Sequence, residues 1–122
     1  MFYPRLVVRD AARAIEFYVA VFDAKETARH TDANGKIVHA EVVIAGATVA
    51  VKDEDDADRS PVTLGGTPVI MALYVDDVDA LGNRLEAHGA TVIYPIADQP
   101  YGERGGRFED PFGHQWMVAR PL

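Results

Sequence analysis

Leu6-Val7-Val8-Arg9-Asp10 opens a pattern that returns 66 positions later as Ala72-Leu73-Tyr74-Val75-Asp76. A stretch with helical spacing follows each of these segments, and it ends at Ala24 in the first half and at Ala90, again 66 positions on, in the second. A pattern that recurs at a fixed offset indicates two copies of one supersecondary unit. The sequence therefore predicts two structural repeats, each beginning with a strand and a helix.

Each predicted helix has one apolar stripe and an acidic start. The stripes consist of Ala11, Ile15, Tyr18 and Phe22 in the first half and of Val78, Leu81 and Leu85 in the second. Such spacing is typical of a helix that packs against a core. We expect Asp10, and either Asp76 or Asp77, to accept hydrogen bonds from the free N–H groups of the first turn. Gly89 is placed to end the second helix in a left-handed conformation.

After each helix the apolar residues alternate, which is typical of half-buried strands. We expect strands at 24–31, 36–44 and 48–52, and again at 91–94, 106–109 and 115–120. Asn34-Gly35, Gly46-Ala47 and Asp110-Pro111-Phe112-Gly113 predict the turns. The prediction is an α+β fold of two tandem βαβββ modules, residues 1–53 and 68–122, joined by a linker at 54–67. A helix covers one face of each curved sheet, so the other faces are free to enclose a cleft.

Composition excludes several classes of function. The chain carries a net charge of −7 and has a pI near 4.9, whereas nucleic-acid binding depends on clustered Lys and Arg. No apolar run approaches the roughly 20 residues of a membrane span, and the first residues lack a signal-peptide pattern. There is no cysteine, hence no disulfide, thiol nucleophile or thiolate metal site. We expect a cytoplasmic protein that binds neither nucleic acid nor a membrane.

The motifs of the two halves resemble a known superfamily. Tyr3-Pro4-Arg5-Leu6-Val7-Val8-Arg9-Asp10, Ala14-Ile15-Glu16-Phe17-Tyr18 and Phe22-Asp23-Ala24 are similar to the opening of vicinal-oxygen-chelate proteins. This is the glyoxalase, bleomycin-resistance and dioxygenase superfamily. His39-Ala40-Glu41 and the segment from Tyr101 through Asp110-Pro111-Phe112-Gly113-His114-Gln115-Trp116 resemble its PhnB-like branch. The resemblance implies the glyoxalase/bleomycin-resistance fold and a homodimer with shared clefts. It leaves the function open, because members include metal-dependent enzymes and metal-free antibiotic binders.

Enzymes of this superfamily hold a divalent metal with His, Gln or Glu from four strands that face the cleft. Alignment of the repeats places those positions at Tyr3, Ala50, Ile70 and Met117. None offers an imidazole or a carboxylate, so we expect no metal and no cofactor. His30, His39 and Glu41 could form another metal site, but they lie beside an exposed turn. His39 and Glu41 are also weak candidates for a catalytic base. His114 follows a turn glycine and is interpreted as a structural hydrogen-bonding group.

Strand alternation predicts which side chains face the cleft. Trp116 falls on the helix side, in the core, whereas Arg5 and Lys52 are candidate partners of an anionic ligand. Residues 98–107 carry Tyr101, Glu103, Arg104 and Arg107 between glycines. They predict either a flap over the cleft, in which Tyr101 stacks and an arginine binds an acidic group, or a surface loop with an internal Glu–Arg pair. The predicted ligand-binding set is Tyr3, Arg5, His39, Ala50, Lys52, Ile70, Tyr74, Tyr101, Arg104 and Met117.

The preferred interpretation is metal-free binding of a small aromatic or amphipathic molecule, as in bleomycin-resistance-like sequestration. Two alternatives stay open. One is a lyase, isomerase or dioxygenase with an atypical metal site or none. The other is a structural domain in which side chains fill the cleft.

Overall fold

The computed structural model describes all 122 residues in eight strands and three helices. The first half consists of β1 (Arg5–Val8), α1 (Ala11–Phe22), β2 (Lys25–Thr31), β3 (Ile37–Ile44) and β4 (Ala47–Asp53). The second half consists of β5 (Ile70–Tyr74), α3 (Val78–Ala87), β6 (Thr91–Asp98), β7 (Glu103–Glu109) and β8 (Gln115–Pro121), and α2 (Pro61–Leu64) lies between the halves. The predicted α+β class and the two βαβββ units are confirmed.

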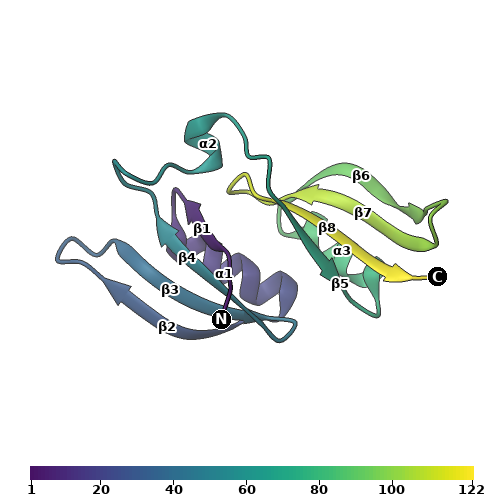
Figure 1. Cartoon of the computed structure of the whole chain (residues 1–122), viewed down its shortest axis with the longest axis horizontal. Helices are drawn as coiled ribbons and strands as arrows, with labels where there is room; N and C mark the ends of the chain where they lie inside the picture. Colours follow the sequence, from purple (N-terminus) through teal and green to yellow (C-terminus); the bar gives the residue numbers. More distant parts are fainter.

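Each half forms its own four-stranded mixed sheet, and the two sheets have the same topology. Their strand orders are β1-β4-β3-β2 and β5-β8-β7-β6. The first strand pairs in parallel with the last, and the other neighbours are antiparallel. In Figure 1 both α1 and α3 lie behind their sheets. The faces opposite the helices, called the open faces below, therefore turn to the same side of the molecule.

The predicted residues set the starts of both long helices and the end of α3. The side chain of Asp10 accepts a hydrogen bond from the N–H of Arg13, and that of Asp77 accepts one from Ala80, each at 3.1 Å. These bonds satisfy amide groups that the first turn leaves free. Gly89 follows α3 with φ of +95°, which is the left-handed conformation expected of it.

The modules are joined by a buried carboxylate and by aromatic packing. Asp110 is 3% exposed, and its Oδ2 accepts hydrogen bonds from the hydroxyl of Tyr18 at 2.7 Å and from Nε1 of Trp116 at 2.9 Å. Burial and the neighbouring Asp110 raise the pKa of Tyr18, which keeps its hydroxyl a donor. Trp116 packs against Phe22 with ring centroids 4.4 Å apart, so its predicted place in the core is confirmed.

Two further hydrogen bonds cross between the modules. Nε of Arg84 donates to the carbonyl oxygen of Val21 at 3.0 Å, and Nε2 of His114 lies 2.9 Å from that of Val7. The interpretation of His114 as a structural group is supported, although its partner is in β1 and not in its own turn. A single core of 23 buried residues extends through both modules.

Two local predictions need correction. The linker forms the short helix α2, and the side chain of Ser60 caps its start by accepting a hydrogen bond from the N–H of Thr63. The hydroxyl of Thr63 donates a hydrogen bond to Glu54 at 2.7 Å. The turn before β4 is Ala45-Gly46, since these two residues have positive φ, and not Gly46-Ala47. A two-residue turn with both φ values positive matches the twist of a hairpin, and it prefers glycine at the second position as well as at the first.

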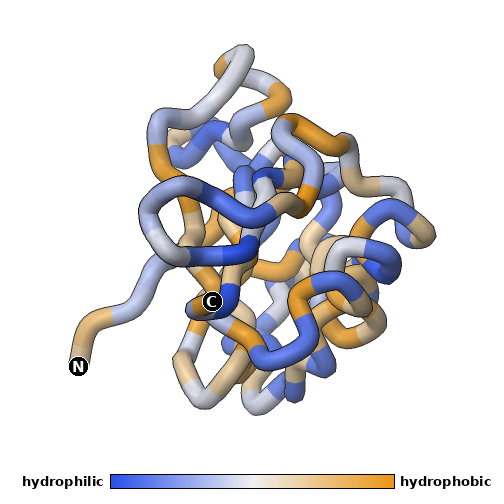
Figure 2. Tube along the Cα trace, turned by 90° about the vertical axis from the view of Figure 1, so that its right-hand side faces the viewer, coloured by the Kyte–Doolittle hydropathy of each residue, from blue (hydrophilic) through white to orange (hydrophobic).

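None of the helices is long and apolar enough to cross a membrane. The N-terminal residues stand away from the body of the molecule in Figure 2, and Met1 and Phe2 are almost fully exposed.

Candidate functional site

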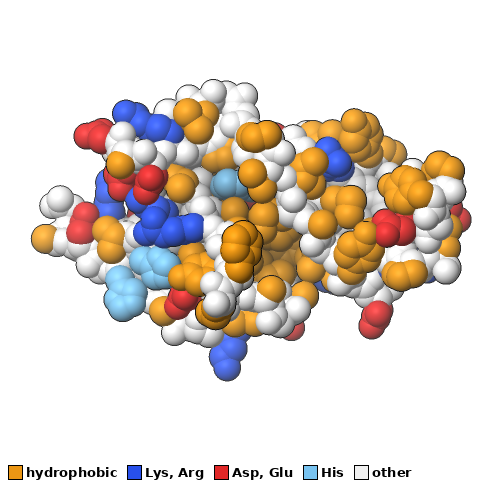
Figure 3. Space-filling view, in the orientation of Figure 1, with side chains coloured by type: hydrophobic (Ala, Val, Ile, Leu, Met, Phe, Trp, Pro, Cys, Tyr) orange, Lys and Arg blue, Asp and Glu red, His pale blue; other side chains and the backbone are white.

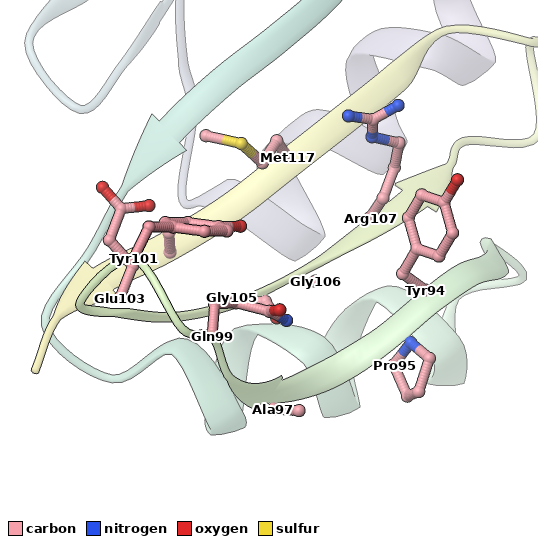
Figure 4. Close-up of a pocket in the computed structure, with 11 residues that line it drawn as sticks. Tyr94, Pro95, Ala97, Gln99, Tyr101, Glu103, Gly105, Gly106, Arg107 and Met117 are labelled. Carbon is pink, nitrogen blue, oxygen red and sulfur yellow. The ribbon is translucent and has the colours of Figure 1, made fainter.

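The open face of module two contains a hollow of about 480 Å³ formed by β6, β7 and β8. The lining residues drawn in Figure 4 come from these three strands and from the turn between β6 and β7. They are Tyr94, Pro95, Ala97, Gln99, Tyr101, Glu103, Gly105, Gly106, Arg107, Met117 and Ala119. A volume of this size accommodates a small organic molecule.

The hollow exists because its floor carries almost no side chains. Gly105 and Ala119 are neighbours across β7 and β8. A Cβ atom on Gly105 would lie 2.6 Å from the carbonyl oxygen of Val118 and 2.9 Å from the Cβ of Ala119. Any larger residue at Gly105 would therefore push the two strands apart and fill the space above them.

A β-bulge in β6 shapes one wall. Tyr94 pairs with Arg107 and Ala97 pairs with Gly105, so Pro95 and Ile96 together face the single residue between them on β7. That residue, Gly106, approaches so closely that an added Cβ would lie 2.7 Å from the carbonyl oxygen of Tyr94. Bulges redirect side chains, and this one brings the Tyr94 ring beside the guanidinium of Arg107. The Cζ of Arg107 lies 5.6 Å from the ring centroid, within the range of a cation–π contact.

The two ends of the hollow differ in charge. At one end stand Tyr94 and Arg107, and at the other Tyr101 and Glu103 (Figure 4). Oε1 of Glu103 accepts a hydrogen bond from the hydroxyl of Tyr74 at 2.6 Å, and this bond raises the pKa of that tyrosine. Tyr74 does not line the hollow itself but contacts Glu103, which does.

The open face of module one is charged where that of module two is apolar. Figure 3 shows histidine and charged side chains gathered over module one and hydrophobic side chains over module two. Lys52 is only 5% exposed, and its Nζ lies 2.8 Å from Asp55 and 2.6 Å from Asp58. The hydrogen bond from Lys52 lowers the pKa of Asp55 to about 2. The two carboxylates hold the buried ammonium group of Lys52 between them.

The expectation that Arg5 and Lys52 are available to an anion is therefore wrong for Lys52 and weakened for Arg5. Nη1 of Arg5 lies 3.7 Å from Asp58, and its Nη2 donates to the carbonyl of Val38 at 3.0 Å. Nε of Arg5 also donates to Nδ1 of His39 at 3.4 Å. Arg5 contributes instead to a second hollow of about 370 Å³, which lies between β1, the linker and His114.

The histidines of module one lie side by side without forming a cluster of ligands. The rings of His30 and His39 are 6.4 Å apart, and Nε2 of His39 lies 3.8 Å from Oε1 of Glu41. No group of three or more His, Asp or Glu side chains converges anywhere in the chain. His39 and Glu41 remain weak candidates for a base.

Residues 98–107 form neither the predicted flap nor a long surface loop. Most of this segment belongs to β6 and β7, and only 99–102 form a turn. Arg104 lies on the helix side, where its guanidinium bonds to Asp79 of α3 at 2.8 Å and to Asp98 at 3.1 Å. Neighbouring residues of a strand point to opposite faces of the sheet. Arg104 and Arg107 are three residues apart on β7, so Arg104 faces the helix and Arg107 faces the hollow.

The positions that hold a metal in this fold do not fit one here. Tyr3 and Ala50 belong to module one, Ile70 and Met117 to module two, and neither alkyl nor thioether groups bind a hard divalent ion well. A phenol is the only oxygen donor among the four side chains. No metal-dependent step follows from this set of residues.

The hollow includes two members of the predicted ligand-binding set, Tyr101 and Met117. Ile70 and Tyr74 lie on the edge strand β5, and Arg104 lies on the helix side. The remaining members, Tyr3, Arg5, His39, Ala50 and Lys52, belong to module one. Four lining residues are not in the predicted set, namely Tyr94, Gln99, Glu103 and Arg107, although the predicted flap contained Glu103 and Arg107. Glu103, Gly105 and Arg107 alternate along one face of β7. Strand alternation would therefore have placed Glu103 and Arg107 beside the hollow if the predicted strand had begun at Glu103.

Two βαβββ sheets of the same topology, with a hollow on one open face, define the class of fold. The chain belongs to the Glyoxalase/Bleomycin resistance protein/Dioxygenase superfamily, whose family model matches residues 2–118. An uncharacterized protein of Mycobacterium bovis, Mb0911c, is 45% identical over 124 aligned residues, which cover 98% of this chain and 82% of that protein.

Solved structures agree with this assignment. TioX from Micromonospora sp. ML1 has a TM-score of 0.78 and 31% identity, with 99% of this chain and 98% of that chain covered. FosX from Listeria monocytogenes, a fosfomycin resistance protein crystallised with Mn(II) and sulfate, has a TM-score of 0.75 with 100% and 90% coverage. The PhnB protein from Bacillus cereus has a TM-score of 0.76 with 98% coverage of both chains. FosX and PhnB are 18% and 16% identical to this chain, so these two likenesses concern the fold alone.

Proposed function

We propose that this protein binds a small, flat organic molecule in the hollow of module two, without a metal, and sequesters it. The observation that carries this proposal is the combination of aromatic walls and an empty floor. Tyr94 and Tyr101 offer ring faces at opposite ends, Met117 offers an adaptable apolar contact, and Gly105 and Ala119 leave room between them. Aromatic and thioether side chains favour aromatic ligands.

Binding is favoured over catalysis because the hollow lacks an available acid–base pair. Glu103 already accepts the Tyr74 hydroxyl, and the one histidine–carboxylate contact, His39 with Glu41, lies on the other module. A general base must reach the proton it removes.

We further propose that the protein is a homodimer in which a second copy covers the open faces. Tyr74, Tyr94 and Tyr101 are each at least half exposed, and Ile70 is 41% exposed. Contiguous exposed apolar groups are typical of a surface that binds a partner. Sedimentation equilibrium should give twice the chain mass of 13.3 kDa. A monomer at concentrations well above the micromolar range would contradict the dimer.

Calorimetric titration and thermal-shift screening against aromatic compounds test the proposed ligand class. A compound at 100 times its Kd should add about 2.7 kcal/mol to the free energy of unfolding. Tyr94→Ala and Tyr101→Ala should each weaken binding about 10-fold, through the loss of an aromatic contact. Val19→Ala truncates an exposed apolar residue of α1 and serves as the control. Conversion of the bound compound to a product would favour an enzyme, and the absence of any binding would contradict the proposal.

A further inference from the structure

Five basic side chains of this acidic chain lie near carboxylates, and Arg107 is not among them. The basic side chains with an acidic partner are Arg5, Arg9, Arg29, Lys52 and Arg104. Arg107 has none, although the chain contains 19 Asp and Glu residues. Its Nε is also the only buried polar side-chain atom of the protein without a hydrogen-bond partner. A buried donor without an acceptor costs free energy, so this guanidinium is poised to gain a partner.

The surroundings of Arg107 suit an aromatic acid. Its guanidinium points into the hollow beside the Tyr94 ring, and Met117 is its neighbour across β7 and β8 (Figure 4). The only carboxylate that lines the hollow, that of Glu103, stands at the other end and is bonded to Tyr74. A ligand whose acidic group faced Arg107 would avoid Glu103 and leave its ring between Tyr94 and Tyr101.

The internal repeat shows that this charge is specific to module two. Met117 pairs with Arg107 as Ala50 pairs with Glu41 in module one. The equivalent positions therefore carry opposite charges, and Arg107 is the only cation that lines the hollow.

We propose that the occupant of the hollow is an aromatic carboxylic acid whose carboxylate accepts two hydrogen bonds from Arg107. This inference rests on the proposed binding function and specifies its ligand. The planar guanidinium matches a carboxylate with two parallel N–H···O bonds. Nε gains an acceptor in that arrangement, and the Tyr94 ring holds the guanidinium in place.

The test compares two probes of the same shape, naphthalene-2-carboxylate and naphthalene-2-carboxamide, by calorimetric titration of the full chain. The wild type should bind the acid at least about 10-fold more tightly than the amide, since hydrogen bonds between charged groups are the stronger ones. Arg107→Met should reduce this preference to less than about 2-fold while it still binds the amide. Arg59→Met, which removes an exposed arginine from the second hollow, should keep the wild-type preference.

Other outcomes overturn the inference. Equal binding of the two probes by the wild type would refute the role of Arg107 and leave the proposed function intact. Binding of neither probe would refute both. A loss of preference in Arg59→Met would place the anion in the second hollow. If Arg107→Met turned the protein into a monomer but kept the preference, Arg107 would instead be bonded to the second copy.

Arg107→Lys covers the case in which the methionine variant does not fold. It retains the charge but not the planar pair of donors, so part of the preference should remain. A preference equal to that of the wild type would exclude the two-bond geometry.

Discussion

In module one, His39 and Lys52 occupy the neighbouring strand positions that Gly105 and Ala119 occupy in module two, at offsets of 66 and 67. Two long polar side chains thus fill the open face of one sheet, whereas a hydrogen atom and a methyl group leave the other hollow. The buried helix-facing positions stay apolar in both modules, because each sheet must pack on its helix. The open face carries no such requirement, so it is where the two copies differ in chemistry.

The largest effect on stability should come from Asp110→Ala, which removes the buried carboxylate that links the two modules. The substitution leaves the hydroxyl of Tyr18, the indole of Trp116 and the backbone N–H groups of Phe112 and His114 without their acceptor. We expect a loss of about 3–4 kcal/mol in the free energy of unfolding. Urea unfolding followed by tryptophan fluorescence measures it.

Tyr18→Phe is the matched control for that experiment. It removes one of the four donors and should cost about 1–2 kcal/mol. If Asp110→Ala cost no more than Tyr18→Phe, the carboxylate would not be the link between the modules.

The next effect concerns the floor of the hollow. Gly105→Val makes module two resemble module one by filling its open face, and its Cβ would collide with Val118 and Ala119. We expect a destabilisation of about 1–3 kcal/mol from overpacking, together with loss of ligand binding. Circular dichroism melts and calorimetric titration measure the two effects. Undiminished binding by a folded Gly105→Val protein would show that the ligand lies elsewhere.

A smaller effect is expected from Lys52→Met, which removes the charge network of module one. The lysine lowers the pKa of Asp55 from 3.8 to about 2, so the stabilisation is present above pH 3.8 and is lost as the pH falls through about 2. At neutral pH the variant should melt less than about 5 °C below the wild type, because the carboxylates are exposed. The difference should vanish below pH 2, and a difference that grew with acid would refute this account.

The smallest effect should come from Arg104→Ala. Arg104 is three residues from Arg107 but bonds to Asp79 and Asp98 on the helix side. Ligand affinity should change less than about 2-fold. A larger change, measured by the titration used for Arg107, would mean that Arg104 reaches the hollow and that the two faces are not separate.

Much of the fold follows from periodicity and spacing along the sequence. The offset of 66 residues predicts the two modules, and Asp10, Asp77 and Gly89 mark the ends of the helices that the structure contains. These signals are local, because a cap or a turn depends on a few neighbouring residues.

The hollow was harder to predict because it depends on contacts between strands. Its wall comes from a bulge opposite Gly106, and a bulge changes the register that alternation assumes. Tyr94 and Arg107 were therefore left out of the predicted ligand-binding set, since they lie near the ends of strands that were predicted too short. The neutralisation of Lys52 by Asp55 and Asp58 depends on how the loop after β4 folds back, which spacing alone does not determine.

The bulge at Pro95 has a consequence for solubility during folding. β6 is an edge strand, and its β-branched and aromatic residues Thr91-Val92-Ile93-Tyr94 favour pairing with a strand of another molecule. Pro95 has no N–H to offer to an incoming strand, and the bulge interrupts the even row of donors and acceptors along the edge. The feature that shapes the wall of the hollow therefore also protects the chain against aggregation through this edge of the sheet.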